Sequence, residues 1–410
     1  MVKKIMKKSM YNIEVKHKDK NLIFNTKTRN CIILDNDEWT KYEGISADYE
    51  KELSDLGIYV NDFDNEYEET VDIINANIAW DKETIRSHTI YATTYCNAHC
   101  HYCFEDSFVR ESMSLQTANK IVDYILGKQE NSKKLYVIWF GGEPLLNVNV
   151  IDVIAKELKK SLPSDVEFRS SIYTNGVLFS DKLIEHAIAE WNLKAVQITI
   201  DGLKTTYENI KGYNFDNGFD LVIERIRAII KAGIRIQIRI NYDDNNVNEI
   251  LELIGVLSDV LPQKKDVVVY ANKIFRTDTD NSKESSAVND FTIFKKLVEC
   301  GFCGDILGSI KNNFNTCLAG GEYSKLYLPS GYIIKCDRDC KSIVGYLDGE
   351  TNQDELDKWK DNRINVMCRD CKVFPLCGGG CIYEFINGKK GCMNSEELVT
   401  MKLQYYLDTL

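Results

Sequence analysis

The chain has 410 residues, of which 44% are hydrophobic and 28% are charged, with a formal net charge of −11. This composition is typical of a soluble globular protein, and the length exceeds that of one ordinary domain. The negative charge argues against nonspecific binding to nucleic acids or anionic membranes, and no segment approaches the roughly 18 apolar residues of a membrane span.

The 14 cysteines indicate metal binding rather than disulfide bonds. Disulfides belong mainly to secreted proteins, and this chain shows no secretory signal, because its basic residues 1–8 are not followed by an apolar segment. We therefore expect a cytoplasmic protein. Oxygen-sensitive clusters on these cysteines would indicate a cell with little oxygen.

Residues 1–80 are expected to form a small α+β domain. Period-2 apolar patterns predict a meander of short strands, and a helix follows it. These elements fall at residues 12–15, 22–25, 31–34 and about 37–42. Residues 52–59 then lead into the acidic stretch 61–69.

Three cysteines follow the next predicted strand in the run Cys-Asn-Ala-His-Cys-His-Tyr-Cys, residues 96–103. A four-iron cluster takes one sulfur ligand per iron, so Cys96, Cys100 and Cys103 would leave one iron open to a ligand from outside the protein. A zinc knuckle or buried thiols is the alternative. Zinc sites normally use paired Cys-x2-Cys arms instead.

Residues 81–299 alternate strands and helices. The expected strands lie at residues 89–93, 134–140, 167–174, 195–200, 235–241 and 267–271. The expected helices lie at residues 114–126, 150–158, 181–191, 219–232 and 246–260. Such βα units in series imply parallel strands with right-handed crossovers, in a doubly wound sheet or an open barrel. Both folds place functional sites at the carboxyl ends of strands.

Polar residues stand at these strand ends. The second strand runs into Trp-Phe-Gly-Gly-Glu-Pro, residues 139–144, where the carboxylate of Glu143 on a glycine turn suits an ammonium group. Further polar strand-end residues are Thr174, Asn175, Thr199 and Asp201. Turn chemistry alone would explain Asn-Gly and Asp-Gly at these points. Arg239, inside the apolar fifth strand, needs a partner if its face is buried.

After about residue 300 the α/β pattern ends and cysteines become frequent. Cys317 is followed by thirteen residues, Gly331, four residues and Cys336. The remaining members of the series are Cys368, Cys371, Cys377, Cys381 and Cys392. The Cys-x2-Cys pair at 368–371 alone would suit zinc as well as iron. Interleaved thiolates in a chain with an iron–sulfur motif favour iron.

The cysteine run and the Gly-Gly-Glu-Pro turn together resemble the radical S-adenosylmethionine (radical SAM) enzymes. The resemblance implies a partial (β/α)6 barrel whose open iron is chelated by the amino and carboxylate groups of S-adenosylmethionine. It implies that Glu143 accepts from the amino group, and that Gly141 and Gly142 permit close approach. The other implied cofactor contacts are Tyr102 beside adenine, and Thr174, Thr199 and Arg239 at ribose or carboxylate.

The seven-cysteine series resembles the C-terminal SPASM extension of radical SAM enzymes, which carries two auxiliary four-iron clusters, so residues 300–410 are expected to form such a domain. The resemblance gives the outer cluster to Cys368, Cys371, Cys377 and Cys392. It gives the inner cluster to Cys317, Cys336 and Cys381. The fourth inner ligand is Cys300, Cys303 or Cys340, or is absent, so that an iron could bind a substrate thiolate. Three [4Fe–4S] clusters are therefore expected.

The resemblance is strongest to peptide maturases that install thioether or related cross-links. It implies that an adenosyl radical removes hydrogen from a ribosomally made precursor peptide with a leader segment, and that a carrier such as flavodoxin or ferredoxin donates electrons. The bond formed stays open among thioether, carbon–carbon and epimerisation. Residues 1–80 resemble, in reduced form, a winged-helix peptide-recognition domain, and a β cap on the barrel is the alternative.

Two other functions were weighed. An anaerobic sulfatase-maturing enzyme that generates formylglycine carries an aspartate base in the position of Asp337, after Cys336. Such enzymes also carry a cysteine where this chain has Lys311, which argues against this function. An electron-transfer or metal-storing protein would need neither a three-cysteine cluster nor the Gly-Gly-Glu-Pro turn.

Overall fold

The structure is a computed structural model that describes residues 6–45, 47–84, 86–129, 132–261, 263–274, 287–310, 317–320, 324–359, 364, 366–389, 391–392 and 395–410. The chain divides into two compact units. The barrel unit comprises Lys82–Phe302 and Leu318–Lys360. The terminal unit comprises Met1–Asp81, Cys303–Cys317 and Asp361–Leu410. The segment after residue 300 is therefore shared between the units.

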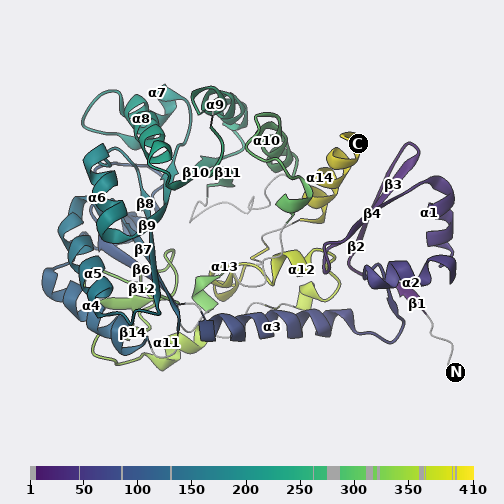
Figure 1. The fold of residues 1–410 in the computed structure, drawn as a ribbon, viewed down its shortest axis with the longest axis horizontal. Coiled ribbons are helices and arrows are strands. Elements are labelled where there is room, and N and C mark those ends of the chain that lie inside the picture. Colours follow the sequence, from purple (N-terminus) through teal and green to yellow (C-terminus); the bar gives the residue numbers. More distant parts are fainter. Residues whose placement is uncertain are drawn as a thin grey trace. The chain divides into compact units, whose positions relative to one another are not determined.

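Six parallel strands form the centre of the barrel unit (Figure 1). They are β6 (Arg86–Thr93), β7 (Lys134–Gly141), β8 (Glu167–Thr174), β9 (Leu193–Thr199), β10 (Arg235–Tyr242) and β11 (Val267–Lys273). Each strand pairs in parallel with the next in sequence. The predicted partial barrel is thus confirmed, and its strand ends fall within three residues of those expected from the apolar runs.

Three further strands extend the sheet beyond β6. β12 (Ser324–Tyr327) pairs in parallel with β6, and β13 (Tyr332–Ile334) and β14 (Gly345–Tyr346) follow it in antiparallel order. The sequence pattern did not predict these short strands. They place the segment that contains Cys336 beside the first barrel strand.

Helices cover one side of the six parallel strands, as Figure 1 shows for α4, α5, α6 and α8. The helices of this unit are α4 (Leu115–Gly127), α5 (Val148–Ser161), α6 (Asp181–Trp191), α7 (Lys204–Lys211), α8 (Gly218–Lys231), α9 (Val247–Val260), α10 (Ala287–Glu299) and α11 (Gln353–Lys358). Each longer helix buries one apolar stripe, such as Ile121, Val122 and Ile125 in α4. Serine side chains cap α4 and α6, at Ser114 and Ser180.

The terminal unit contains two small antiparallel sheets. Its strands are β1 (Met6–Lys8), β2 (Asn12–His17), β3 (Lys20–Asn25), β4 (Cys31–Leu34) and β5 (Tyr59–Asn61), with β2, β3 and β4 in one sheet and β1 and β5 in the other. Its helices are α1 (Asn36–Glu43), α2 (Ala47–Asp55), α3 (Glu66–Thr84), α12 (Phe374–Cys377), α13 (Ile382–Ile386) and α14 (Glu396–Asp408).

The two ends of the chain share a core in this unit. Phe24 of β3 packs in one buried cluster with Leu376 of α12 and Leu403 of α14. The Thr26 hydroxyl also donates to the carbonyl of Lys372 at 2.5 Å. Residues near the N-terminus therefore support the segment that carries Cys371 and Cys377.

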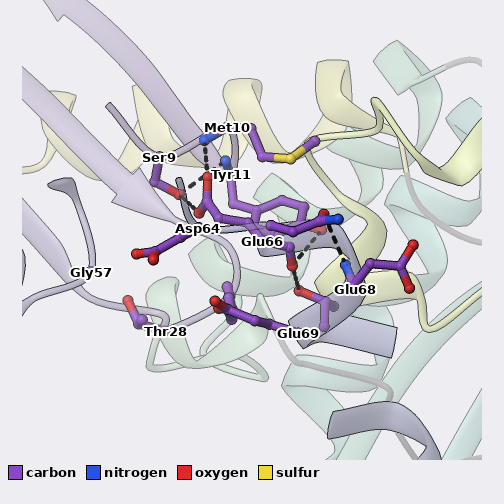
Figure 2. Close-up of polar contacts among 12 residues, drawn as sticks. Ser9, Met10, Tyr11, Thr28, Gly57, Asp64, Glu66, Glu68 and Glu69 are labelled. Carbon is purple, nitrogen blue, oxygen red and sulfur yellow. Dashed lines mark hydrogen bonds and ion pairs between the residues drawn. The ribbon is translucent and has the colours of Figure 1, made fainter. Parts of the chain in front are cut away.

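The acidic stretch at residues 61–69 begins helix α3, which the sequence pattern did not predict. Its residue Glu66 is buried, and its carboxylate accepts from the hydroxyl of Ser9 and from the Met10 N–H at 2.9 Å (Figure 2). The Thr70 hydroxyl donates to the Glu66 carbonyl at 2.7 Å. This network fixes α3 to the start of the chain. Among the helices that the structure describes, none is long and apolar enough to span a bilayer.

Candidate functional site

The cysteine loop, residues 94–103, begins where β6 ends. The thiols of Cys96, Cys100 and Cys103 are free and half-buried. The Ala98 N–H donates to the sulfur of Cys96 at 3.4 Å, and the Cys103 N–H donates to the carbonyl of Cys100 at 3.0 Å. The loop thus turns tightly and presents all three predicted ligands from ten consecutive residues.

These thiols fit a four-iron cluster better than a single metal ion. Across the described stretches of the chain, no three histidine, cysteine or acidic side chains converge as ligands of one ion. A four-iron cluster places its thiolates on separate irons and needs no such convergence. Burial raises the pKa of Cys96 to about 11 and that of Cys103 to about 12, so bound iron would have to stabilise the thiolates.

The Gly-Gly-Glu turn is joined to the cysteine loop by backbone contacts. The Gly142 N–H donates to the carbonyl of Thr93 at 3.0 Å, and the Glu143 N–H donates to the carbonyl of Tyr95 at 2.9 Å. A Cβ on Gly141 or Gly142 would collide with these same carbonyls. The glycines are therefore required for strand-to-loop packing, and their predicted role in cofactor approach stays a prediction.

Glu143 is a fully buried carboxylate between two strand ends. Its Oε1 accepts from the Thr174 hydroxyl at 2.7 Å and from the Leu145 N–H at 3.1 Å, and its Oε2 accepts from the Asn175 N–H at 2.8 Å. Burial raises its pKa to about 7 against the effect of these hydrogen bonds. A ligand ammonium would supply the positive charge that stabilises the ionised form.

Asn175 connects this carboxylate to the cysteine loop. Its side-chain amide donates to Asn97 at 2.7 Å and lies 4.0 Å from the sulfur of Cys96. The predicted positions Glu143, Thr174 and Cys96 therefore lie together, as strand-end residues of neighbouring parallel strands should. Their contacts with a cofactor stay predictions.

A second polar cluster lies at the ends of β9 and β10. Arg239 Nε donates to the side chain of Asn241 at 2.9 Å, and Asn241 Nδ2 donates to Asp201 at 2.9 Å. Asp201 in turn forms a 2.8 Å ion pair with Lys211, and both side chains are at most 5% exposed. Thr199 is half-buried and is the register partner of Arg239.

Tyr102 points its hydroxyl into the same cluster. The hydroxyl is buried, and burial together with Asp201 and Cys100 raises the pKa of the phenol, whereas Lys211 lowers it. The sequence gave no role to Lys211. Its spacing of four residues from Tyr207 is the signal, because it places both side chains on one face of α7.

In the barrel unit, Cys336 and Cys340 stand after β13. The Cys336 thiol lies 3.6 Å from Asp337, and the Cys340 thiol lies 3.9 Å from the hydroxyl of Ser107. Cys317 and Cys381 belong to the terminal unit. The ligand set of the inner cluster stays a prediction.

Within the terminal unit, glycines bring the last cysteines together. Gly380 and Gly391 touch so closely that a Cβ on Gly380 would overlap the Gly391 carbonyl. The Cys381 N–H donates to that carbonyl at 2.8 Å. Cys392 is near enough to raise the pKa of the Cys371 thiol, although burial is the larger cause. These contacts agree with Cys371 and Cys392 binding the same outer cluster, which stays a prediction.

Residues 90–257 match the family model for the Radical SAM superfamily. An uncharacterized protein of Methanocaldococcus jannaschii is 35% identical over 112 residues, which cover 27% of this chain and 37% of that protein, or little more than a third of its length. The radical SAM cyclopropyl synthase TigE of Paramaledivibacter caminithermalis is 23% identical over 346 residues, which cover 73% of this chain and 68% of TigE.

The solved structure of native anSMEcpe with bound AdoMet (S-adenosylmethionine) has the same fold, with a TM-score of 0.62 at 16% identity over 79% of this chain and 97% of that one. Its form with AdoMet and the Cp18Cys peptide gives a TM-score of 0.59 at 17% identity, over 80% and 97%. The family match and the cysteine loop beside Glu143 agree with this barrel fold. The chain belongs to the radical SAM superfamily and is a radical SAM enzyme that uses S-adenosylmethionine and an iron–sulfur cluster.

Proposed function

We propose that this enzyme modifies a ribosomally made precursor peptide and installs a cross-link, most consistently a thioether. The observation that carries the proposal is the buried carboxylate of Glu143, which three hydrogen bonds orient beside the cysteine loop. Such a group binds the ammonium of S-adenosylmethionine through charge-assisted hydrogen bonds. Bound together, the cluster and S-adenosylmethionine supply a carbon-centred radical able to abstract hydrogen from an unactivated carbon.

The inner face of the barrel strands supports a peptide substrate. Phe140 of β7 and Tyr173 of β8 contact edge to face at 5.5 Å between ring centres, and both are half-buried. Arg239 is the register partner of Tyr270 on β11, whose hydroxyl donates to Gln197 at 2.7 Å. Half-exposed aromatic and cationic groups suit a polypeptide segment. The anSMEcpe structure with a bound peptide agrees with this substrate class.

The C-terminal cysteines support cross-linking. A carbon radical that joins a thiolate forms one carbon–sulfur bond and must release one electron, so the reaction needs an acceptor. Auxiliary clusters on the seven cysteines between Cys317 and Cys392 would provide it. Flavodoxin or ferredoxin would return electrons to the enzyme, and residues 1–80 would bind the leader by adding a strand to a sheet edge.

One observation favours sulfatase maturation as a second candidate. Asp337 follows Cys336 and is near enough to raise the pKa of Tyr173, although burial and two tyrosines contribute more. A carboxylate near the inner face could act as the base that this chemistry needs.

The test is anaerobic turnover of the reconstituted enzyme with two kinds of peptide. One set is encoded by short cysteine-containing reading frames beside the gene, and the other carries a sulfatase cysteine motif. We expect 5′-deoxyadenosine together with loss of two hydrogens from a precursor peptide, without loss of sulfur. Conversion of the sulfatase cysteine to formylglycine would replace the proposal with the second candidate, and loss of neither change would contradict both.

A further inference from the structure

Asp201 and Lys211 form a buried ion pair directly beneath the cysteine loop. Their side chains are 1% and 5% exposed, whereas every other Lys–Asp or Lys–Glu pair among the described residues has at least one side chain 25% or more exposed. The 2.8 Å contact is ionic rather than a directed hydrogen bond. Taking both charges out of water is costly, and apolar residues often stabilise such a site as well or better. Stability alone therefore does not account for the pair.

The pair is joined to the loop that carries the predicted ligands. The carbonyl of Lys211 accepts from the His99 N–H at 2.7 Å, and His99 stands next to Cys100. Gly212, at φ 56°, ends α7 there, and a Cβ on it would already touch the side chain of His99 at 3.5 Å. The end of α7 is thus fastened to the middle of the loop.

The ammonium is held on the side of the loop by further groups. Lys211 Nζ lies 5.5 Å from the centre of the Tyr207 ring, and Asn241 holds the other oxygen of Asp201 at 2.9 Å. Burial raises the pKa of the Cys100 thiol, the Lys211 charge lowers it, and Asp201 raises it by less than Lys211 lowers it. At the sulfur of Cys100 the pair therefore acts as a net positive charge.

We propose that Asp201 and Lys211 are positioning residues that fasten the cysteine loop and set the reduction potential of the cluster on Cys96, Cys100 and Cys103. This cluster is called the site cluster. A net positive charge in a low-dielectric setting stabilises the reduced cluster, because reduction adds one negative charge. The inference concerns the site cluster alone and does not depend on the identity of the peptide.

The test is an anaerobic redox titration of the reconstituted full-length enzyme without peptide. It follows the electron paramagnetic resonance signal that responds to added S-adenosylmethionine, which identifies the cluster with an open iron. Asp201→Asn keeps the ammonium and removes the carboxylate, so we expect a higher potential. The shift should be on the order of a tenfold change in the reduction equilibrium, about 59 mV for one electron.

The double variant Asp201→Asn with Lys211→Met separates field from charge count. It carries the same net charge as the wild type, yet it should titrate at a lower potential, because the Lys211 effect exceeds that of Asp201. Lys211→Arg keeps the charge and should titrate like the wild type. The matched control is Asp220→Asn, which removes an exposed carboxylate paired with Lys204 and should leave the potential unchanged.

An Asp201→Asn potential that is unchanged or lowered would overturn the proposal. If that variant holds no site cluster, the double variant decides, and a potential equal to the wild type rejects the redox role. If neither holds the cluster while Lys211→Arg does, the pair serves loop structure alone, and the redox role is likewise rejected.

Discussion

The hydroxyl of Thr174, at the end of β8, donates to Oε1 of Glu143, beyond the end of β7, at a distance of 2.7 Å. The contact holds a fully buried carboxylate in one orientation beside the cysteine loop. Thr174 therefore acts on the cofactor site through Glu143, whether or not it also contacts the cofactor. Predictions about this site begin with the carboxylate.

Replacing Glu143 by Gln should weaken binding of S-adenosylmethionine about ten- to a hundredfold, because hydrogen bonds to charged groups contribute about 1.5–3 kcal/mol. Isothermal titration calorimetry of the cluster-loaded enzyme under anaerobic conditions measures the change. Thr174→Ser keeps the donating hydroxyl and is the control, with affinity expected near that of the wild type. Unchanged affinity in Glu143→Gln would remove the carboxylate from the cofactor site.

The affinity for S-adenosylmethionine should fall as the pH drops through about 7. Burial raises the pKa of Glu143 from 4.5 to about 7, so below that pH the free site holds a neutral carboxyl that binds an ammonium poorly. Glu143→Gln has no such titration and should flatten this part of the profile. A profile of the same shape in the variant would assign the pH dependence to another group.

The same shift predicts how the unliganded protein responds to pH. Between pH 4.5 and about 7 the folded state holds a proton on Glu143 that the unfolded state has released, so the free energy of unfolding from this group falls as the pH rises. Thermal unfolding of the wild type and of Glu143→Gln at pH 5 and pH 8 measures it. The variant should gain stability relative to the wild type at pH 8.

Replacing Cys96, Cys100 and Cys103 together by Ala should remove one cluster and all cleavage of S-adenosylmethionine. The predicted ligand sets give about twelve irons in the wild type and about eight in the triple variant. Iron analysis and 5′-deoxyadenosine release measure the two effects. Continued cleavage by the triple variant would contradict the ligand assignment, and about four irons with bound zinc in the wild type would contradict the auxiliary clusters.

Phe24→Ala should destabilise the terminal unit by about 3–5 kcal/mol and lower the auxiliary iron content. Phe24 shares a core with Leu376, which lies between Cys371 and Cys377, so a cavity there loosens the predicted outer ligands. Urea unfolding and iron analysis report both effects. Phe63→Ala is the matched control, because Phe63 is 83% exposed. Normal iron in a destabilised Phe24→Ala would show that the cysteines fold independently of the N-terminal strands.

The sequence determined the barrel strands and the grouping of the cofactor residues. Continuous apolar runs such as β8 (Glu167–Thr174) are local signals, and their parallel order follows from the helices between them. Since parallel strands end at one edge of the sheet, Glu143 and Thr174 had to come together. The cysteine spacing of the loop is likewise local, so it pointed to a cluster with an open iron before any fold was known.

Only the tertiary structure showed that Lys211 is buried against Asp201 and fastened to His99, and that Phe24 shares a core with Leu376. A lysine near the end of a short helix is usually solvated, and no local pattern says that a loop more than a hundred residues earlier will cover it. A core built from strands and helices over 350 residues apart leaves equally little local trace. Burial is a property of the assembled fold, whereas strand pattern and ligand spacing are properties of the chain.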